Sequence, residues 1–165
     1  MKLLPTALAI GLSLTALVSC VPAASGSGAI PRRDAEAMAA RNVAVSMNLA
    51  SLLSREMGRQ VAPRLVDAWL SEAPSGRYSP YKQIGRSGSG NLFLVAVSEY
   101  DGDRISLVIY DDRGQEQDRG EPTAHYDFLV LKPTTHSFRV HMVNCSLPSS
   151  SACSVSIGLY RIEPR

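Results

Sequence analysis

The three cysteines of this chain are the residues whose chemical roles are easiest to assign from the sequence. They are Cys20, Cys145 and Cys153. A cysteine sulfur can be acylated, oxidised to a disulfide or bound to a metal ion, and its surroundings decide among these outcomes. Cys20 directly follows an uncharged run, whereas Cys145 and Cys153 bracket the turn-rich loop Ser-Leu-Pro-Ser-Ser-Ser-Ala. We therefore expect the first cysteine to have a different role from the other two.

The first twenty residues have the pattern of an export signal. Met1-Lys2 is positively charged, and residues 3–18 are uncharged, interrupted by Pro5 and too short for a comfortable membrane span. Leu17-Val18-Ser19-Cys20 resembles the bacterial lipobox, in which a signal peptidase cuts before the cysteine. This resemblance implies a lipoprotein signal peptide over residues 1–19 and acyl chains on the thiol and the freed amine of Cys20.

Lipidation of Cys20 would hold the protein on a membrane of the bacterial cell envelope, because each buried methylene contributes about 0.8 kcal/mol. Residues 20–33 are rich in small residues and are predicted to be a flexible tether. Val21, rather than Asp, follows the cysteine, which in enteric bacteria implies sorting to the outer membrane. An ordinary signal peptide cut after Ala23 or Ala24 is the alternative, and it would discard Cys20.

Cys145 and Cys153 are predicted to form a disulfide. Export places them in an oxidising compartment, where thiols tend to pair. A bridge across so short a loop would stabilise the fold by about 2–3 kcal/mol. A metal pair is the alternative, but no third or fourth ligand has suitable spacing, so no metal site is expected.

No catalytic residue is predicted. His125 and His136 fall in turns, and His141 shares a strand face with Arg139. The HExxH, G-x-S-x-G and phosphate-loop motifs are absent; residues 85–90 match none of them. We therefore expect neither an enzyme nor a bound cofactor.

Two groups of residues in turns and at strand ends are consistent with ligand binding. Five aspartates could supply oxygen ligands to calcium, although turn chemistry alone also explains them. Five tyrosines could stack on a sugar or a peptide, although half-buried rings are the simpler interpretation. The aspartates are Asp101, Asp103, Asp111, Asp112 and Asp118, and the tyrosines are Tyr78, Tyr81, Tyr100, Tyr110 and Tyr126.

The charges argue against nucleic acid as a partner. The 165 residues include 17 Lys and Arg and 15 Asp and Glu, a formal net charge of +2, and these residues are scattered. Nucleic-acid binding needs several phosphates neutralised from one face.

With 45% apolar residues, the chain can bury one globular core.

Residues 34–75 have the pattern of a helical segment. A first helix is predicted to stop at Gly58, and its apolar residues recur at steps of three, four or seven. A second helical run has Pro63 near its first turn. We expect both apolar stripes to pack against the following sheet or a partner. The first comprises Met38, Val45, Leu49, Leu52, Leu53 and Met57, and the second Leu65, Val66, Trp69 and Leu70.

Residues 76–165 have the pattern of short strands separated by turns. Predicted strands cover 91–98, 104–110, 126–132, 137–144 and a last segment that starts near Ser154. Residues 91–98 are apolar on both faces, which is typical of a central strand. In the last strand Val155, Ile157 and Leu159 alternate with small or polar residues. The spacing favours an antiparallel sandwich over a βαβ sheet.

The strands and turns from about Tyr81 to Arg161 resemble the bacterial prepeptidase C-terminal domain. The matching pieces are Asn91-Leu-Phe-Leu-Val-Ala-Val before the Asp101-Gly102-Asp103 turn, Ile105-Ser-Leu-Val-Ile-Tyr-Asp-Asp-Arg-Gly114 and Phe138-Arg-Val-His-Met-Val-Asn144. The resemblance implies a β-sandwich with an accessory or binding role. Relatives often have Asp-Leu-Asp-Leu where this chain has Arg104-Ile105-Ser106-Leu107, so no cation role is carried over.

Together these patterns predict an α+β fold: an N-terminal helical segment followed by a jelly-roll-like antiparallel β-sandwich. They predict a non-catalytic envelope lipoprotein that faces the periplasm or the cell surface and serves as a binding module for another envelope protein. The alternative is a module that binds a glycan or calcium and acts on extracellular polymer.

Overall fold

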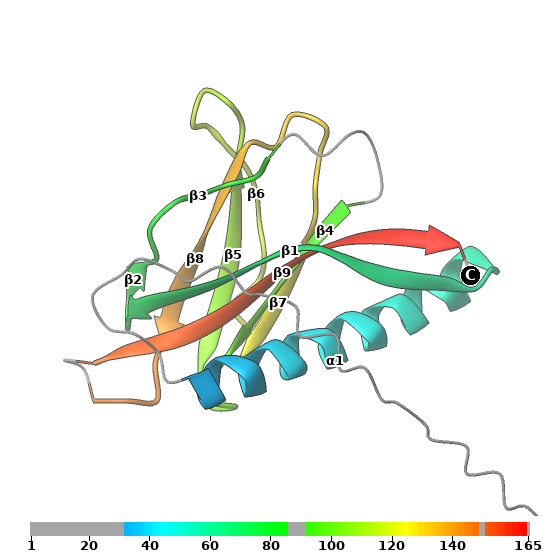
Figure 1. Ribbon diagram of the computed structural model, residues 1–165. Helices are drawn as coiled ribbons and strands as arrows, with labels where there is room; N and C mark the ends of the chain where they lie inside the picture. The colour runs from blue at the N-terminus through cyan, green and yellow to red at the C-terminus, as the bar shows by residue number, and fades with distance from the viewer. Residues whose placement is uncertain (1–31, 86–91, 149–150, 165) are drawn as a thin grey trace, which may run out of the picture.

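The computed structural model describes residues 32–85, 92–148 and 151–164. In these ranges one helix precedes nine strands arranged in two antiparallel sheets, which confirms the predicted α+β, sandwich-like arrangement (Figure 1). The predicted signal peptide, Cys20 and most of the predicted tether lie outside the described residues. The elements are α1 (Arg32–Met57), β1 (Val61–Pro74), β2 (Arg77–Tyr78), β3 (Lys82–Gln83), β4 (Leu92–Ser98), β5 (Arg104–Tyr110), β6 (Glu116–Arg119), β7 (Tyr126–Val130), β8 (Ser137–Asn144) and β9 (Ala152–Pro164).

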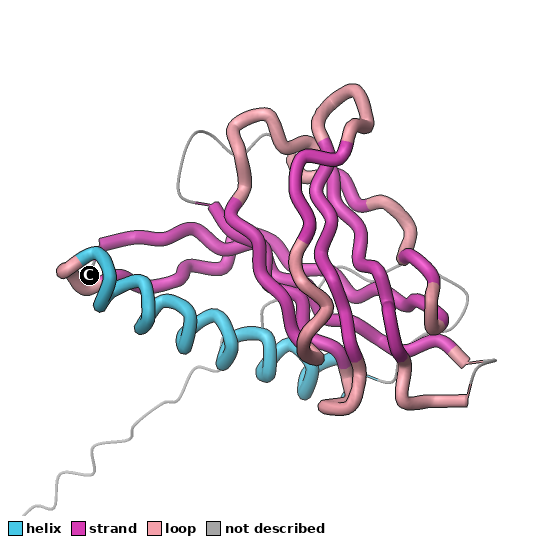
Figure 2. The backbone as a smooth tube through the Cα atoms, turned by 180° about the vertical axis from the view of Figure 1, so that it is seen from behind, coloured by secondary structure: helices cyan, strands magenta, loops and turns pink. Residues whose placement is uncertain are grey.

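The molecule has three layers: α1, a first sheet and a second sheet. Sheet A has the strand order β1-β9-β4-β7, and sheet B has the order β2-β8-β5-β6, with β3 also paired to β8. One apolar cluster joins the facing sides of the two sheets, and a second joins the outer side of sheet A to α1. Figure 2 shows the helix running along one side of the paired strands β1 and β9.

Burial follows the predicted strand patterns. All seven residues of β4 are buried, and the strand lies between β9 and β7, so the prediction of a central strand is confirmed. In β9, Val155, Ile157 and Leu159 belong to the cluster between the sheets. The alternate residues of β9 face α1, where Tyr160 joins the second cluster.

Helix α1 begins two residues before the predicted start and ends next to Gly58, as predicted. Gly58 has a φ of 62°, a left-handed conformation that suits glycine at a helix C-terminus. Met38 and Leu49 of the predicted stripe are buried, but Leu52 is 55% exposed. No helix in the described ranges has the length and apolar character needed to cross a membrane.

The predicted second helix is wrong, because residues 61–74 form the edge strand β1. This strand pairs with β9 along its whole length, from Val61 opposite Pro164 to Pro74 opposite Ala152. The strand has a register shift between Leu65 and Asp67, and Leu65 and Val66 are 49% and 42% exposed, so the helix-like spacing of its apolar residues does not correspond to one buried face. Long-range pairing therefore overrides the local period, and an edge strand tolerates Pro63 because one side of its backbone has no neighbouring strand.

A buried asparagine fixes α1 on sheet A. The Asn42 side chain donates to the Val95 and Ser156 carbonyl oxygens, at 2.9 Å each, and accepts a 2.6 Å hydrogen bond from the Tyr160 hydroxyl. A Cβ on Gly158 would lie 2.6 Å from the Asn42 Oδ1, so this close approach requires glycine. Burial raises the pKa of Tyr160, which therefore remains a hydrogen-bond donor at neutral pH.

Replacing Asn42 is therefore expected to destabilise the fold. Asn42→Ala would leave two carbonyl groups and one hydroxyl group without their partner and should lower the free energy of unfolding by about 2–4 kcal/mol. Urea denaturation measures this change. The matched control is Asn48→Ala, at an exposed position of the same helix, which should change stability by less than about 0.5 kcal/mol. Equal effects of the two substitutions would contradict the assigned role.

Candidate binding site

The predicted disulfide between Cys145 and Cys153 is confirmed. It links the end of β8 to β9, with the two Cα atoms 5.8 Å apart. Asp103 Oδ1 lies 3.7 Å from the Cys153 sulfur, and with the two cysteines it forms the one group of three possible metal-ligand side chains in the described ranges. Both sulfur atoms are consumed by the disulfide bond, so they offer no thiolate to a metal ion.

The aspartates proposed as calcium ligands have several different partners. The Asp101 carboxylate pairs with Arg41, and the buried Asp103 carboxylate accepts from the Ser98 hydroxyl and the Ser146 backbone N–H. Asp111 accepts from backbone N–H groups of its own turn, as turn aspartates commonly do. Protein hydrogen-bond and ion-pair partners thus account for these three carboxylates.

The outer face of sheet B brings together aromatic and cationic side chains that are far apart in the sequence. We call this set the tyrosine–arginine cluster, and it comprises Tyr78, Tyr81, Tyr110 and Arg139. Within the described ranges, α1 packs on sheet A and no helix covers this face of sheet B. Tyr100 and Tyr126 belong to other parts of the molecule, so the structure gathers three of the five candidate tyrosines.

Strand alternation positions the cluster. Phe138, Val140 and Met142 of β8 point into the core between the sheets, so Arg139 and His141 project from the opposite face. His141 is directly opposite Tyr78 of β2, and the rings stack with centroids 4.3 Å apart. In β5, which pairs with β8, Leu107 and Ile109 point into the core between the sheets. Tyr110, the last residue of β5, therefore projects from the same outer face as Arg139.

The Arg139 guanidinium lies among three tyrosine rings. Its central carbon is 3.9 Å from the Tyr78 ring centroid, 4.6 Å from that of Tyr81 and 5.2 Å from that of Tyr110. Its Nε donates a 2.7 Å hydrogen bond to the Tyr110 hydroxyl. Tyr81 packs edge-on against Tyr110 and is 51% exposed, so one ring of the cluster is open to a ligand.

A second arginine on this face is already neutralised. Arg119 of β6 donates to both carboxylate oxygens of Glu116, at 2.9 and 2.7 Å, and to the Tyr78 hydroxyl at 3.0 Å. The hydrogen bond from Arg119 lowers the pKa of Glu116, so this pair stays ionised at neutral pH. Burial and the charges of Arg119 and Arg139 lower the pKa of His141 and favour its neutral form.

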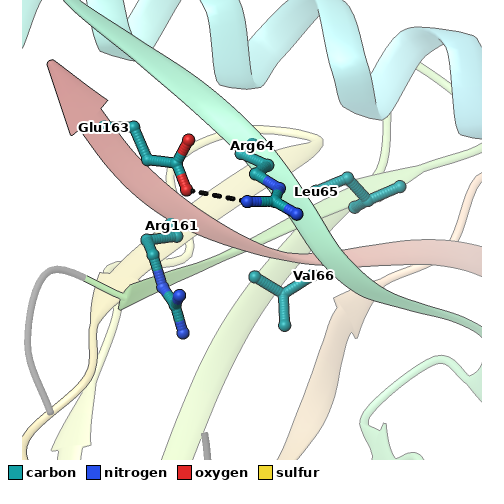
Figure 3. A pocket seen from close by; sticks show the side chains of 5 residues that line it. All are labelled: Arg64, Leu65, Val66, Arg161 and Glu163. Atoms are coloured by element: carbon teal, nitrogen blue, oxygen red, sulfur yellow. Dashed lines mark hydrogen bonds and ion pairs between the residues drawn. The ribbon is translucent and has the colours of Figure 1, made fainter. Parts of the chain in front are cut away.

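Two shallow hollows lie away from the cluster. One, of about 190 Å³, is lined by Arg64, Leu65, Val66, Arg161 and Glu163 (Figure 3). There Arg64 donates to Glu163, and the Arg161 side chain points away from this pair. The other, of about 380 Å³, lies where β6 and β7 approach and is lined by Arg119, Gly120, Glu121, Thr123, Ala124, Tyr126, Asp127 and Phe128.

Asp127 is a buried carboxylate in the second hollow. It accepts backbone hydrogen bonds from Leu107 of β5 and from Phe128, and so connects sheet B to the edge strand of sheet A. A Cβ on Gly120 would overlap this carboxylate, so glycine is required there too. Burial raises the pKa of Asp127 to about 6, although the two N–H donors act in the opposite direction.

Comparison with known proteins identifies no relative. No family model matches this chain, and no curated protein has a matching sequence. The resemblance to the prepeptidase C-terminal domain therefore remains a prediction.

The cluster was only partly visible in the sequence. The tyrosines were candidates, and His141 was placed on one strand face with Arg139, but nothing in the sequence showed that Tyr78 and Tyr81 would meet that face. Cross-strand pairing between β2 and β8, at a separation of about sixty residues, brings them there. The sequence held one usable signal: in β8 the polar residues Arg139 and His141 alternate with apolar residues, which indicates that the two share the outer face of the strand.

The raised pKa of Asp127 predicts a pH-dependent stability. Because the folded protein holds this proton more tightly than the unfolded chain, stability should fall as pH rises from about 4 to about 6 and then level off. Asp127→Asn should remove up to about 2 kcal/mol of this decrease. Urea denaturation across this range, with Asp118→Asn as an exposed control, measures the difference. An unchanged slope in the Asp127 variant would overturn this assignment.

Proposed function

We propose that this chain is a non-catalytic, lipid-anchored module of the bacterial cell envelope that binds a glycan through the tyrosine–arginine cluster. The observation that carries the proposal is the convergence of three tyrosine rings and one arginine on the outer face of sheet B, which no helix of the described residues covers. Tyrosine presents an apolar ring and a polar hydroxyl, which together suit the alternating apolar and hydroxylated faces of sugars.

The apolar stripe of α1 is used largely within the fold and not for a protein partner. Met38 and Leu49 are buried, Val45 packs in the cluster between α1 and sheet A, and the second predicted helix is strand β1. The helix thus uses most of this surface on sheet A. The cluster therefore favours a glycan over a protein as the main ligand of this module.

A protein partner remains the second candidate because of one surface. The edge strand β7 exposes Tyr126, Phe128 and Val130, which are 40%, 44% and 57% exposed and share one face of the strand. An exposed apolar row on an edge strand is a surface that proteins use to bind one another. This row lies on sheet A, separate from the cluster.

The proposal includes the finer predictions from the sequence. These are the lipobox with Cys20 as the anchor, the location at the outer membrane, the jelly-roll-like winding and the relationship to the prepeptidase C-terminal domain. The disulfide supports an oxidising, extracytoplasmic location, since such bonds persist there. The separate surroundings of the three histidines, with His141 stacked on Tyr78 and His125 beside Asp101, favour a non-catalytic role.

The anchor is tested at Cys20. Cys20→Ser should abolish labelling by a radioactive fatty acid and move the protein from the membrane fraction to the soluble fraction, because the acyl chains would be lost. The double variant Cys145→Ser/Cys153→Ser serves as the control: it removes both cysteines of the disulfide, leaves Cys20 in place and should leave labelling intact. Continued labelling of the Cys20 variant would contradict the proposed anchor.

The binding face is tested at Tyr81. Purified mature protein should retain surface polysaccharide of the cell that produces it, measured by affinity electrophoresis. Tyr81→Ala should weaken this binding about tenfold, since aromatic contacts of this kind contribute roughly 1–1.5 kcal/mol.

The control for this measurement is Tyr126→Ala, which removes an exposed tyrosine from the other sheet and should leave glycan binding unchanged. Should Tyr126→Ala weaken glycan binding while Tyr81→Ala does not, the cluster is not the site. Wild-type protein that retains no polysaccharide would remove the glycan proposal altogether.

A further inference from the structure

We infer that the glycan carries a carboxylate and that Arg139 is the residue that binds it. This inference rests on the proposed function and adds the chemical class of the ligand. It follows from the charge, the hydrogen bonding and the surroundings of one guanidinium group.

No carboxylate in the described ranges forms an ion pair with Arg139: Glu116, whose pKa the charge of Arg139 helps to lower, is bound by Arg119 through two hydrogen bonds. In the described part of the chain, the one hydrogen bond of Arg139 is from Nε to the neutral Tyr110 hydroxyl. Burial raises the pKa of Tyr110, so this hydroxyl stays neutral. The lowered pKa of His141 favours its neutral form, so it adds no positive charge beside Arg139. Glu116 carries one negative charge beside the two arginines Arg119 and Arg139, so these described groups leave one positive charge in excess.

The terminal nitrogens of Arg139 remain accessible. They have no hydrogen-bond partner in the described ranges, and no fully buried side-chain nitrogen there lacks one, so both reach solvent. A guanidinium group presents two parallel N–H donors that match the two oxygens of a carboxylate. The Nε bond to Tyr110 and the ring of Tyr78 hold this group in one orientation before a ligand arrives.

An acidic sugar satisfies both parts of the cluster at once. Its carboxylate would accept from Arg139, and its ring would lie on the exposed face of Tyr81, whose centroid is 4.6 Å from the guanidinium carbon. A partly desolvated charge pair of this kind is stronger than one in open water. A neutral sugar would use Tyr81 alone and leave the arginine unpaired.

Three other arginines of the two sheets do not combine these features. Arg119 is neutralised by Glu116, and Arg64 donates to Glu163. Arg161 has no acidic partner in the described ranges, but the hollow that it lines contains no aromatic ring (Figure 3). Arg161 is therefore a matched control: an arginine without a counter-ion and without tyrosines.

The experiment compares two oligosaccharides that differ in charge alone. The probes are a hexamer of galacturonic acid and its carboxyl-reduced form, in which each carboxylate has become a primary alcohol. Isothermal titration of the mature protein should give at least tenfold tighter binding of the acidic hexamer, and this advantage should shrink as salt is added. Arg139→Gln should abolish the advantage, and Arg161→Gln should leave it within twofold.

Arg139→Lys tests the geometry of the group. It keeps the charge but loses the parallel donors, so it should recover less than half of the lost binding free energy. Thermal melting of each variant checks that the fold is retained, and Arg139→Lys keeps the test valid if Arg139→Gln fails to fold.

The outcomes separate this inference from the proposed function. If the two hexamers bind equally and Tyr81→Ala weakens both, the glycan site stands and the acidic preference is wrong. If the acidic hexamer is preferred but Arg161→Gln removes the preference, Arg139 is the wrong residue. If neither hexamer binds, while surface polysaccharide is still retained through Tyr81, the inference fails and the proposed function survives.

Discussion

The burial of strand β4 on both faces is the constraint on which the rest of this structure depends. Its seven residues are all buried, so sheet A must be covered on each side. Sheet B covers the inner side, and α1 covers the outer side through Leu49, Val45 and their neighbours. Sheet A is thereby enclosed over β4. The outer face of sheet B, which no helix in the described part of the chain covers, is the surface on which the polar and aromatic cluster forms.

Polar groups determine how these layers fit together. An apolar contact between a helix and a sheet is tolerant of sliding, because burial of area depends weakly on register. Asn42 removes this freedom, since its three hydrogen bonds can form at one position of α1 over β4 and β9. Asp127 fixes the two sheets relative to each other. Its carboxylate, on the edge strand β7 of sheet A, accepts a hydrogen bond from Leu107 of β5 in sheet B. Both contacts depend on a glycine, Gly158 or Gly120, that leaves room for the side chain.

In the tyrosine–arginine cluster, a guanidinium group without an ion-pair partner is still held in a fixed orientation. Arg139 is held by ring faces and by one hydroxyl group, none of which neutralises it. Arg119, a short distance along the same face, is held by a carboxylate and is therefore electrostatically satisfied. The contrast between these two arginines is the physical basis for expecting an anionic ligand at one and a structural role at the other.

Three features could be predicted from sequence patterns: the strands whose side chains alternate or are apolar on both faces, the end of α1 at Gly58, and the pairing of Cys145 with Cys153. In each case the signal is local: a period of two, a left-handed glycine, or two cysteines that bracket one loop. The tertiary structure alone decided that residues 61–74 are a strand, because their partner in β9 is some ninety residues away. It also decided that Asn42 is buried and that Tyr78 and Tyr81 meet Arg139. Those outcomes depend on pairing energies between distant segments, and no pattern within a short window contains them.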